Sequence, residues 1–289
     1  MTVIENDFLK ATIDPRGAQL SSLINKATGT ELMWQADEKF WPWHAPNLFP
    51  VIGSLINNQI IVNGKPYTIE TRHGFVRVSD MLPIETTSSQ AKFSLPYNSH
   101  TMEMYPFKFE YQVIYDLIDN ALRVTYKVIN LDAGSIYFSV GGHPAFNVPF
   151  HAGEKYEDYY LDFEVEEPLV EHLLNTEGFF NGETQPVKLD GKKLFLTRNL
   201  FDHDALIFKN LKSRQVTIRS TQHSEHITVD FPHFNYLGVW AKTGADFVCI
   251  EPWLGCADSA GEPKELKHKE AIQKLDHGHV FETAFFVSI

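Results

Sequence analysis

Short segments in which hydrophobic and polar residues alternate dominate the chain, and turn residues separate them. In residues 109–117 and 122–128, aromatic or aliphatic side chains occupy every second position. A period of two is typical of half-buried β-strands. The same reasoning predicts further strands at 2–14, 18–24, 30–35, 59–62, 65–69, 135–140, 159–164, 205–208, 215–219, 226–230, 237–241, 247–251 and 280–288.

Turn signals between these segments indicate hairpins. Asn63-Gly64 is the strongest of them, because both residues readily adopt the left-handed backbone that a two-residue hairpin turn requires. Strands at this density predict an all-β protein, a large antiparallel β-sandwich. Residues 263–275 are rich in Lys and Glu and have helical propensity, but their apolar positions fit a helical stripe poorly, so a helix there stays open. We find no repeat or linker and expect residues 1–289 to form a single domain.

Composition narrows the class of protein. The 22 Phe and 11 Tyr residues favour β structure and aromatic-lined clefts. A net charge of −12, without a Lys/Arg run, makes nucleic acid and anionic membranes unlikely partners. The N-terminus lacks a basic region followed by an apolar core, and no apolar run reaches the ~18 residues of a spanning helix. Cys249 and Cys256 are expected as free thiols, so we predict a soluble cytoplasmic protein. Nothing in the sequence indicates the oligomeric state.

The first candidate for chemistry is His143, which follows Gly141-Gly142 at the end of the strand predicted at 135–140. Glycines allow close approach of neighbouring chains, and Pro144 biases His143 toward an extended backbone. An imidazole held in this way can exchange protons near neutral pH. The same sequence is also an ordinary strand end.

The second candidate is Glu251, which ends an apolar strand just before Pro252 and Trp253. A carboxylate in such a strand is costly to desolvate unless it is paired or functional, and burial makes it a better base. Trp253 offers a flat apolar face that suits a sugar ring. The alternative is an exposed strand end with a packed tryptophan.

Two further stretches carry polar groups that suit a ligand. Arg72, His73 and Arg77 surround Gly74 and can donate hydrogen bonds to hydroxyls or a phosphate, although a solvated basic loop fits them equally well. Asp204 precedes an apolar strand, where it either accepts from sugar hydroxyls or caps a turn.

Neither a metal nor a cofactor is expected. The close histidine pairs, His223/His226 and His277/His279, have no clustered third ligand in a recognisable motif. The chain also lacks the glycine-rich motifs of nucleotide and dinucleotide enzymes and the nucleophile motif of serine hydrolases.

Six motifs together resemble one family. In order, they are the segments 47–53, 63–67, 72–77, 142–147, 204–209 and 249–253. Their order over nearly the whole chain is similar to that of the aldose 1-epimerase (galactose mutarotase) family, in particular its bacterial branch near the hexose-6-phosphate mutarotases. Many relatives read Phe-Pro-x-x-Gly-Arg, whereas here Ser54 follows Gly53, so an arginine that helps bind the sugar is replaced. Arg72 is a candidate substitute.

The resemblance implies a β-supersandwich fold and interconversion of sugar anomers without a cofactor or metal. It implies that His143 is the catalytic acid and Glu251 the base, that His73 and Asp204 bind substrate, and that Arg77 supplies a cationic contact. Arg72, Trp253 and Phe146 are expected to contact the same sugar or sugar phosphate. Two alternatives stay open: a non-catalytic carbohydrate-binding or sensing protein with the same cleft, and an epimerase or isomerase acting at another carbon.

Overall fold

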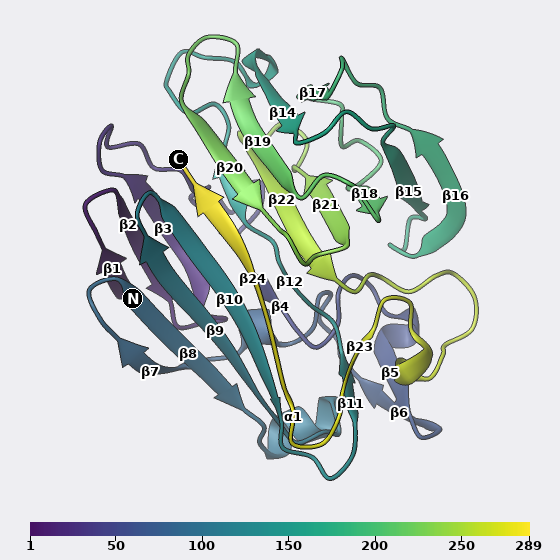
Figure 1. The fold of residues 1–289 in the computed structure, drawn as a ribbon. Helices are drawn as coiled ribbons and strands as arrows, with labels where there is room; N and C mark the ends of the chain where they lie inside the picture. Colours follow the sequence, from purple (N-terminus) through teal and green to yellow (C-terminus); the bar gives the residue numbers. More distant parts are fainter.

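The computed structural model describes all residues 1–289 and is nearly all β. Two antiparallel sheets dominate it (Figure 1). The nine-stranded sheet has the order β17(Lys193–Phe195), β14(Tyr159–Phe163), β19(Gln215–Ser220), β20(His226–Asp230), β24(Val280–Ser288), β10(Ala121–Asn130), β9(Phe109–Ile118), β8(Gln90–Pro96), β7(Leu82–Thr86). The eight-stranded sheet, which has β13(Ala145–Asn147) as an additional partner of β22, has the order β16(Phe180–Pro186), β15(Val170–Leu174), β18(Leu206–Lys209), β21(Tyr236–Trp240), β22(Phe247–Leu254), β12(Val140–Gly142), β4(Asn47–Leu48).

Three small sheets complete the fold. They are β1(Thr2–Glu5) with β2(Leu9–Asp14) and β3(Gln19–Asn25), the hairpin β5(Gln59–Val62)–β6(Lys65–Thr68), and β11(Ile136–Phe138) with β23(Gln273–Leu275). The single α-helix, α1(Ser99–Met104), and the 3₁₀ turns η1(Ile56–Asn58), η2(Val76–Val78), η3(Tyr156–Asp158) and η4(Leu266–His268) are short. No helix is long and apolar enough to span a lipid bilayer.

Side chains from both large sheets meet in one hydrophobic cluster of 69 buried residues. Along β9 every second side chain, beginning with Phe109, points into this cluster. Phe49, just after β4, stacks on Tyr111 of β9 with ring centroids 4.6 Å apart, which joins the two sheets. The alternation that predicted the strand therefore also predicts which face is buried.

The antiparallel all-β class is confirmed, and so are most strands. The pair predicted at 109–128 forms β9 and β10 in register, with Leu117 opposite Leu122. Asn63 and Gly64 form the hairpin turn with φ of 52° and 74°. Figure 1 shows C-terminal β24 beside β10 within the nine-stranded sheet.

Several predicted elements differ. Residues 2–14 form two strands, because the Asn6 side chain accepts hydrogen bonds from the Phe8 and Leu9 N–H groups and turns the chain. Residues 30–35 make only isolated bridges. The strand predicted at 135–140 is interrupted at Ser139, where the chain leaves β23 as partner and joins β22.

The segment 263–275 contains no α-helix. It forms η4 and β23, and Ala271, with φ of 57°, has a left-handed backbone that a right-handed helix cannot include. The helix α1 was not predicted; it is capped by Asn98, whose side chain accepts the Thr101 N–H in a capping box. Strands β4, β7, β8, β13, β15, β16, β17 and β23 were also not predicted.

Candidate active site

A cavity of about 130 Å³ lies on the eight-stranded sheet and brings distant segments together. Its lining consists of Trp41, Gly53, Arg72, His73, Arg77, His143, Leu174, Asp204, Ala205, Ile207, Trp240, Glu251, Trp253 and Ala257. All the site residues predicted from the sequence are among them except Phe146.

His143 and Glu251 form the centre of this cavity. The Nε2 atom of His143 lies 3.2 Å from Oε2 of Glu251, and only 9% and 2% of the two side chains are exposed. Nδ1 of His143 and Oε2 of Glu251 are buried without a hydrogen-bond partner in the protein. A basic and an acidic group are therefore in direct contact, and the carboxylate oxygen nearest His143 has no other partner in the protein.

The positions of Glu251 and Trp253 follow from strand geometry. They are two residues apart on β22 and so project from the same face of the sheet. Glycines stand opposite them on the neighbouring strands: Gly238 pairs with Glu251 and Gly141 with Trp253. A Cβ atom at Gly141 would lie 2.7 Å from Cδ1 of Trp253, and one at Gly238 would lie 2.7 Å from its Cη2. The two glycines thus make room for the indole, and Gly141 provides the close approach expected of it.

His73 is held by the backbone of Gly53. The Gly53 N–H donates to Nδ1 of His73 at 3.1 Å, and the His73 N–H donates to the Gly53 carbonyl at 3.1 Å. With Nδ1 as acceptor, the neutral imidazole carries its proton on Nε2. His73 and Asp204 both have left-handed backbones, with φ of 69° and 87°. Such strain is uncommon outside glycine and clusters at functional sites.

Of the two arginines at the cavity, only Arg72 forms an ion pair with a carboxylate. Arg72 lies 3.6 Å from Asp204, in an ion pair that is partly exposed. Arg77 stacks on the Trp43 ring at 4.2 Å and forms no ion pair with a carboxylate. One guanidinium charge is therefore uncompensated by an adjacent carboxylate.

Burial dominates the protonation of the site. It lowers the pKa of His143 well below its usual value, and the Arg77 charge acts in the same direction. It raises the pKa of Glu251 well above its usual value, against the attraction of Arg72. Burial, followed by Arg72, His143 and Arg77, also lowers the pKa of His73. Burial and then Arg72 lower the pKa of Arg77 to about 10. A carboxylate beside His143 favours a charged imidazole, but desolvation opposes this and favours a neutral imidazole beside a protonated carboxyl group.

Sequence reasoning missed two tryptophans and misplaced one phenylalanine. Trp41 stacks on His143 with ring centroids 4.9 Å apart, and Trp240 meets the same imidazole edge-on at 5.9 Å. The aromatic run 40–43 was a usable signal for Trp41. Phe146 is fully buried in the core, because β13 turns its side chain away from the cavity, and its assignment to the sugar is corrected.

The side chains of Ser54 and Arg72 both lie close to Gly178, in the turn that follows β15. A Cβ atom at Gly178 would lie 2.6 Å from Oγ of Ser54 and 3.7 Å from Cζ of Arg72. The Ser54 hydroxyl and the Arg72 guanidinium thus both approach Gly178.

One set of side chains has the spacing of a metal site. Donor atoms of His143, Cys249 and Glu251 all lie within 4.8 Å of one another. Burial, followed by the charge of Glu251, raises the pKa of the Cys249 thiol well above its usual value, and a protonated thiol is a poor ligand. The arrangement therefore fits proton exchange better than metal binding.

Comparison with known proteins identifies relatives with the same fold. The galactose mutarotase related enzyme from Lactobacillus acidophilus superposes with a TM-score of 0.92, with 34% identity over 99% of this chain and 96% of that one. The galactose mutarotase-like protein from Lactobacillus casei superposes with a TM-score of 0.93, with 36% identity over 100% and 99%. The fold is thus that of the galactose mutarotase-like β-sandwich proteins.

The sequence comparisons define the family. The family described as Aldose 1-epimerase matches residues 1–269. The plasmid-encoded protein LacX of Lactococcus lactis is 36% identical over 284 residues, which cover 95% of each chain. The chain belongs to the aldose 1-epimerase family, and it is an isomerase of the mutarotase type.

Proposed function

We propose that the protein interconverts the α and β anomers of a hexose or hexose phosphate, with His143 and Glu251 as the acid–base pair. The observation that carries this proposal is their 3.2 Å contact at a cavity lined by tryptophans. Mutarotation needs one group to take the proton of the C1 hydroxyl and another to protonate the ring oxygen. A buried pair that shares a proton supplies both.

In the proposed mechanism, Glu251 accepts the C1 hydroxyl proton while protonated His143 donates to the ring oxygen. The ring opens to the aldehyde, and the pair becomes a neutral imidazole beside a carboxylic acid. The C1–C2 bond rotates, and the reverse transfers close the ring on the other face. Because burial favours the neutral forms of both side chains, it stabilises the pair in the state that accompanies the open-chain sugar.

The remaining side chains suit roles in sugar binding. His73 presents an Nε2–H donor, Asp204 presents carboxylate oxygens, and Trp253 offers its indole face to the apolar side of the ring. Arg77, which has no carboxylate partner, supports a phosphorylated hexose as substrate. Arg72, which approaches Gly178 as Ser54 does, is our candidate for the role of the replaced arginine.

The test is anomer exchange, measured by polarimetry or exchange NMR, on glucose, galactose and their 6-phosphates. Acceleration with unchanged sugar identity is the expected result. Binding without exchange on every sugar would instead identify a carbohydrate sensor, and formation of a different sugar would identify an epimerase or isomerase acting at another carbon. The acid–base pair argues against the sensor, because binding alone does not require it.

A further inference from the structure

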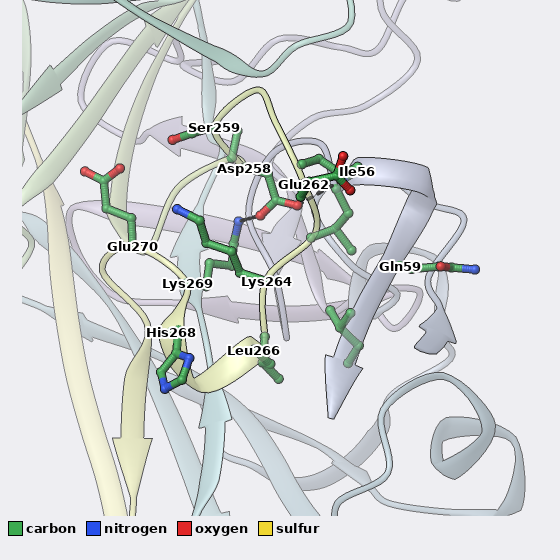
Figure 2. Close-up of a pocket in the computed structure, with 13 residues that line it drawn as sticks. Ile56, Gln59, Asp258, Ser259, Glu262, Lys264, Leu266, His268, Lys269 and Glu270 are labelled. Atoms are coloured by element: carbon green, nitrogen blue, oxygen red, sulfur yellow. Dashed lines mark hydrogen bonds and ion pairs between the residues drawn. The ribbon is translucent and has the colours of Figure 1, made fainter. Parts of the chain in front are cut away.

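A second cavity adjoins the active-site cavity and shares Ala257 with it. Figure 2 shows its lining, in which the side chains of Asp258 and Lys269 point toward each other. The two form an ion pair, and their side chains are 19% and 6% exposed. A buried pair of this kind is costly to desolvate, so its retention calls for a structural reason.

The contacts of Asp258 supply that reason. Its Oδ2 accepts the Ile56 N–H at 2.9 Å, and its own N–H donates to the Ser54 carbonyl at 3.0 Å. Its carbonyl accepts the Phe180 N–H at 2.9 Å. A single residue thus connects Lys269 to the 54–56 segment and to the start of β16.

The 54–56 segment directly follows Gly53, the residue that holds His73. Gly53 donates to Nδ1 of His73 and accepts its N–H, and its backbone packs against Ala257, with only 2.5 Å between a Cβ placed on Gly53 and the Ala257 Cβ. The segment is therefore fixed on one side by Asp258 and on the other by His73. A shift of this backbone would change the orientation of the imidazole toward the cavity.

We propose that Asp258, charge-paired with Lys269, is a positioning residue that holds the 53–56 backbone and thereby fixes the tautomer and orientation of His73 at the cavity. Asp258 does not line the active-site cavity. Its influence on the sugar is indirect, through Ser54, Gly53 and His73. The kinetic consequence rests on the proposed function, whereas the effect on the His73 imidazole does not.

The experiment compares Asp258→Ala, Asp258→Asn and Lys269→Met with the wild type in the full chain. Nitrogen-15 NMR of the His73 imidazole reports the Nε2–H tautomer, and anomer exchange gives kcat and KM. In Asp258→Ala we expect a second His73 tautomer and a KM raised about threefold to tenfold, with kcat nearly unchanged, as for the loss of one hydrogen-bonded contact to substrate. Asp258→Asn, which keeps an acceptor for the Ile56 N–H, should restore most of the His73 signal.

Asp116→Asn is the matched control, because Asp116 is a buried carboxylate paired with Arg123 at 2.9 Å on the nine-stranded sheet. It should change stability without changing the His73 signal. If Asp258→Ala does not fold, Lys269→Met carries the test, because it leaves Asp258 without its charge partner and should also produce a second His73 tautomer. An unchanged His73 signal in folded Asp258→Ala or folded Lys269→Met, or an equal change in Asp116→Asn, would overturn the proposal. A wild type without exchange activity would count against the proposed function alone.

Discussion

Nε2 of His143 lies 3.2 Å from a carboxylate oxygen of Glu251, although the two residues are 108 positions apart and neither side chain is more than 9% exposed. The first comes from the segment between β12 and β13 and the second from the middle of β22, which pairs with both strands. The sheet therefore fixes their separation. Proton exchange between them needs no movement of the backbone.

Replacing either member of the pair should abolish most of the exchange activity. We expect Glu251→Gln and His143→Gln each to lower kcat for anomer exchange by about 10²–10⁴-fold, since a positioned acid or base contributes that much. The double variant should be little slower than either single one, because the two groups act as a unit. Polarimetry on folded protein measures the rates.

Glu171→Gln is the matched control for these variants. Glu171 is also a buried glutamate on the eight-stranded sheet, hydrogen-bonded to Gln185, but it does not line the cavity. It should keep near-wild-type kcat. Full activity in both Glu251→Gln and His143→Gln would disprove the assignment.

The pH dependence of exchange should have a broad maximum. The pair works only while it holds a single proton in total, so activity falls when a second proton binds and when the shared one is lost. The lowered pKa of His143 moves the acid limb below the ordinary histidine value of 6.5, and the raised pKa of Glu251 moves the alkaline limb above the ordinary 4.5. Arg72, Arg77, His73, Asp204 and Cys249 are the other titratable groups that face the pair.

A profile of kcat/KM against pH on an uncharged hexose checks this expectation, because the substrate itself does not titrate there. An acid limb well above 6.5 would show that the imidazolium is stabilised in the free protein. The attraction of the Glu251 carboxylate would then have a larger effect on the pKa of His143 than burial has.

The sequence predicted those parts of the molecule that depend on local patterns. Alternation along 109–128 identified β9 and β10, and Asn63-Gly64 identified a hairpin. His143 and Glu251 were singled out because each is a titratable group beside glycine or proline at a predicted strand end, although β22 in fact continues past Glu251 to Leu254, and their roles came from the family resemblance. In contrast, the 3₁₀ turn and strand within 263–275 form through contacts with β11 and with Asp258, which no local propensity encodes.

The positions of the aromatic side chains at the site also could not be predicted from local sequence patterns. Phe146 and Trp253 both closely follow a proline in the sequence, yet one enters the core and the other lines the cavity. Which face each occupies depends on the register in which β12 and β13 pair with β22, and that register is visible only in the assembled sheet. Trp41 reaches His143 across 102 positions, a contact that the sequence alone does not indicate.

Arg77 should distinguish phosphorylated from free hexoses. We expect Arg77→Met to lower kcat/KM for a hexose 6-phosphate about tenfold to hundredfold, the size of one lost charge-assisted hydrogen bond, and to change that for the free hexose much less. Arg123→Met, which removes a guanidinium paired with Asp116 outside the cavity, is the control. Equal loss on both sugars would show that Arg77 acts on the shape of the cavity rather than on a phosphate.

Gly238 should be required for the position of Trp253. A methyl group at Gly238 would lie 2.7 Å from Cη2 of the indole and 3.3 Å from Cβ of Glu251, so the ring must tilt. We expect Gly238→Ala to raise KM and to lower the free energy of unfolding by about 1–3 kcal/mol, as is usual for overpacking a buried site. Trp253 fluorescence should change as well, because its surroundings change.

Gly134→Ala is the control, since a Cβ atom there meets nothing within 4 Å, and it should leave KM and fluorescence as they are. If Gly238→Ala matched Gly134→Ala in KM, stability and fluorescence, the position of the Trp253 indole would not depend on Gly238. The indole would then be free to shift away from an added methyl group, in contradiction to the close packing at this position.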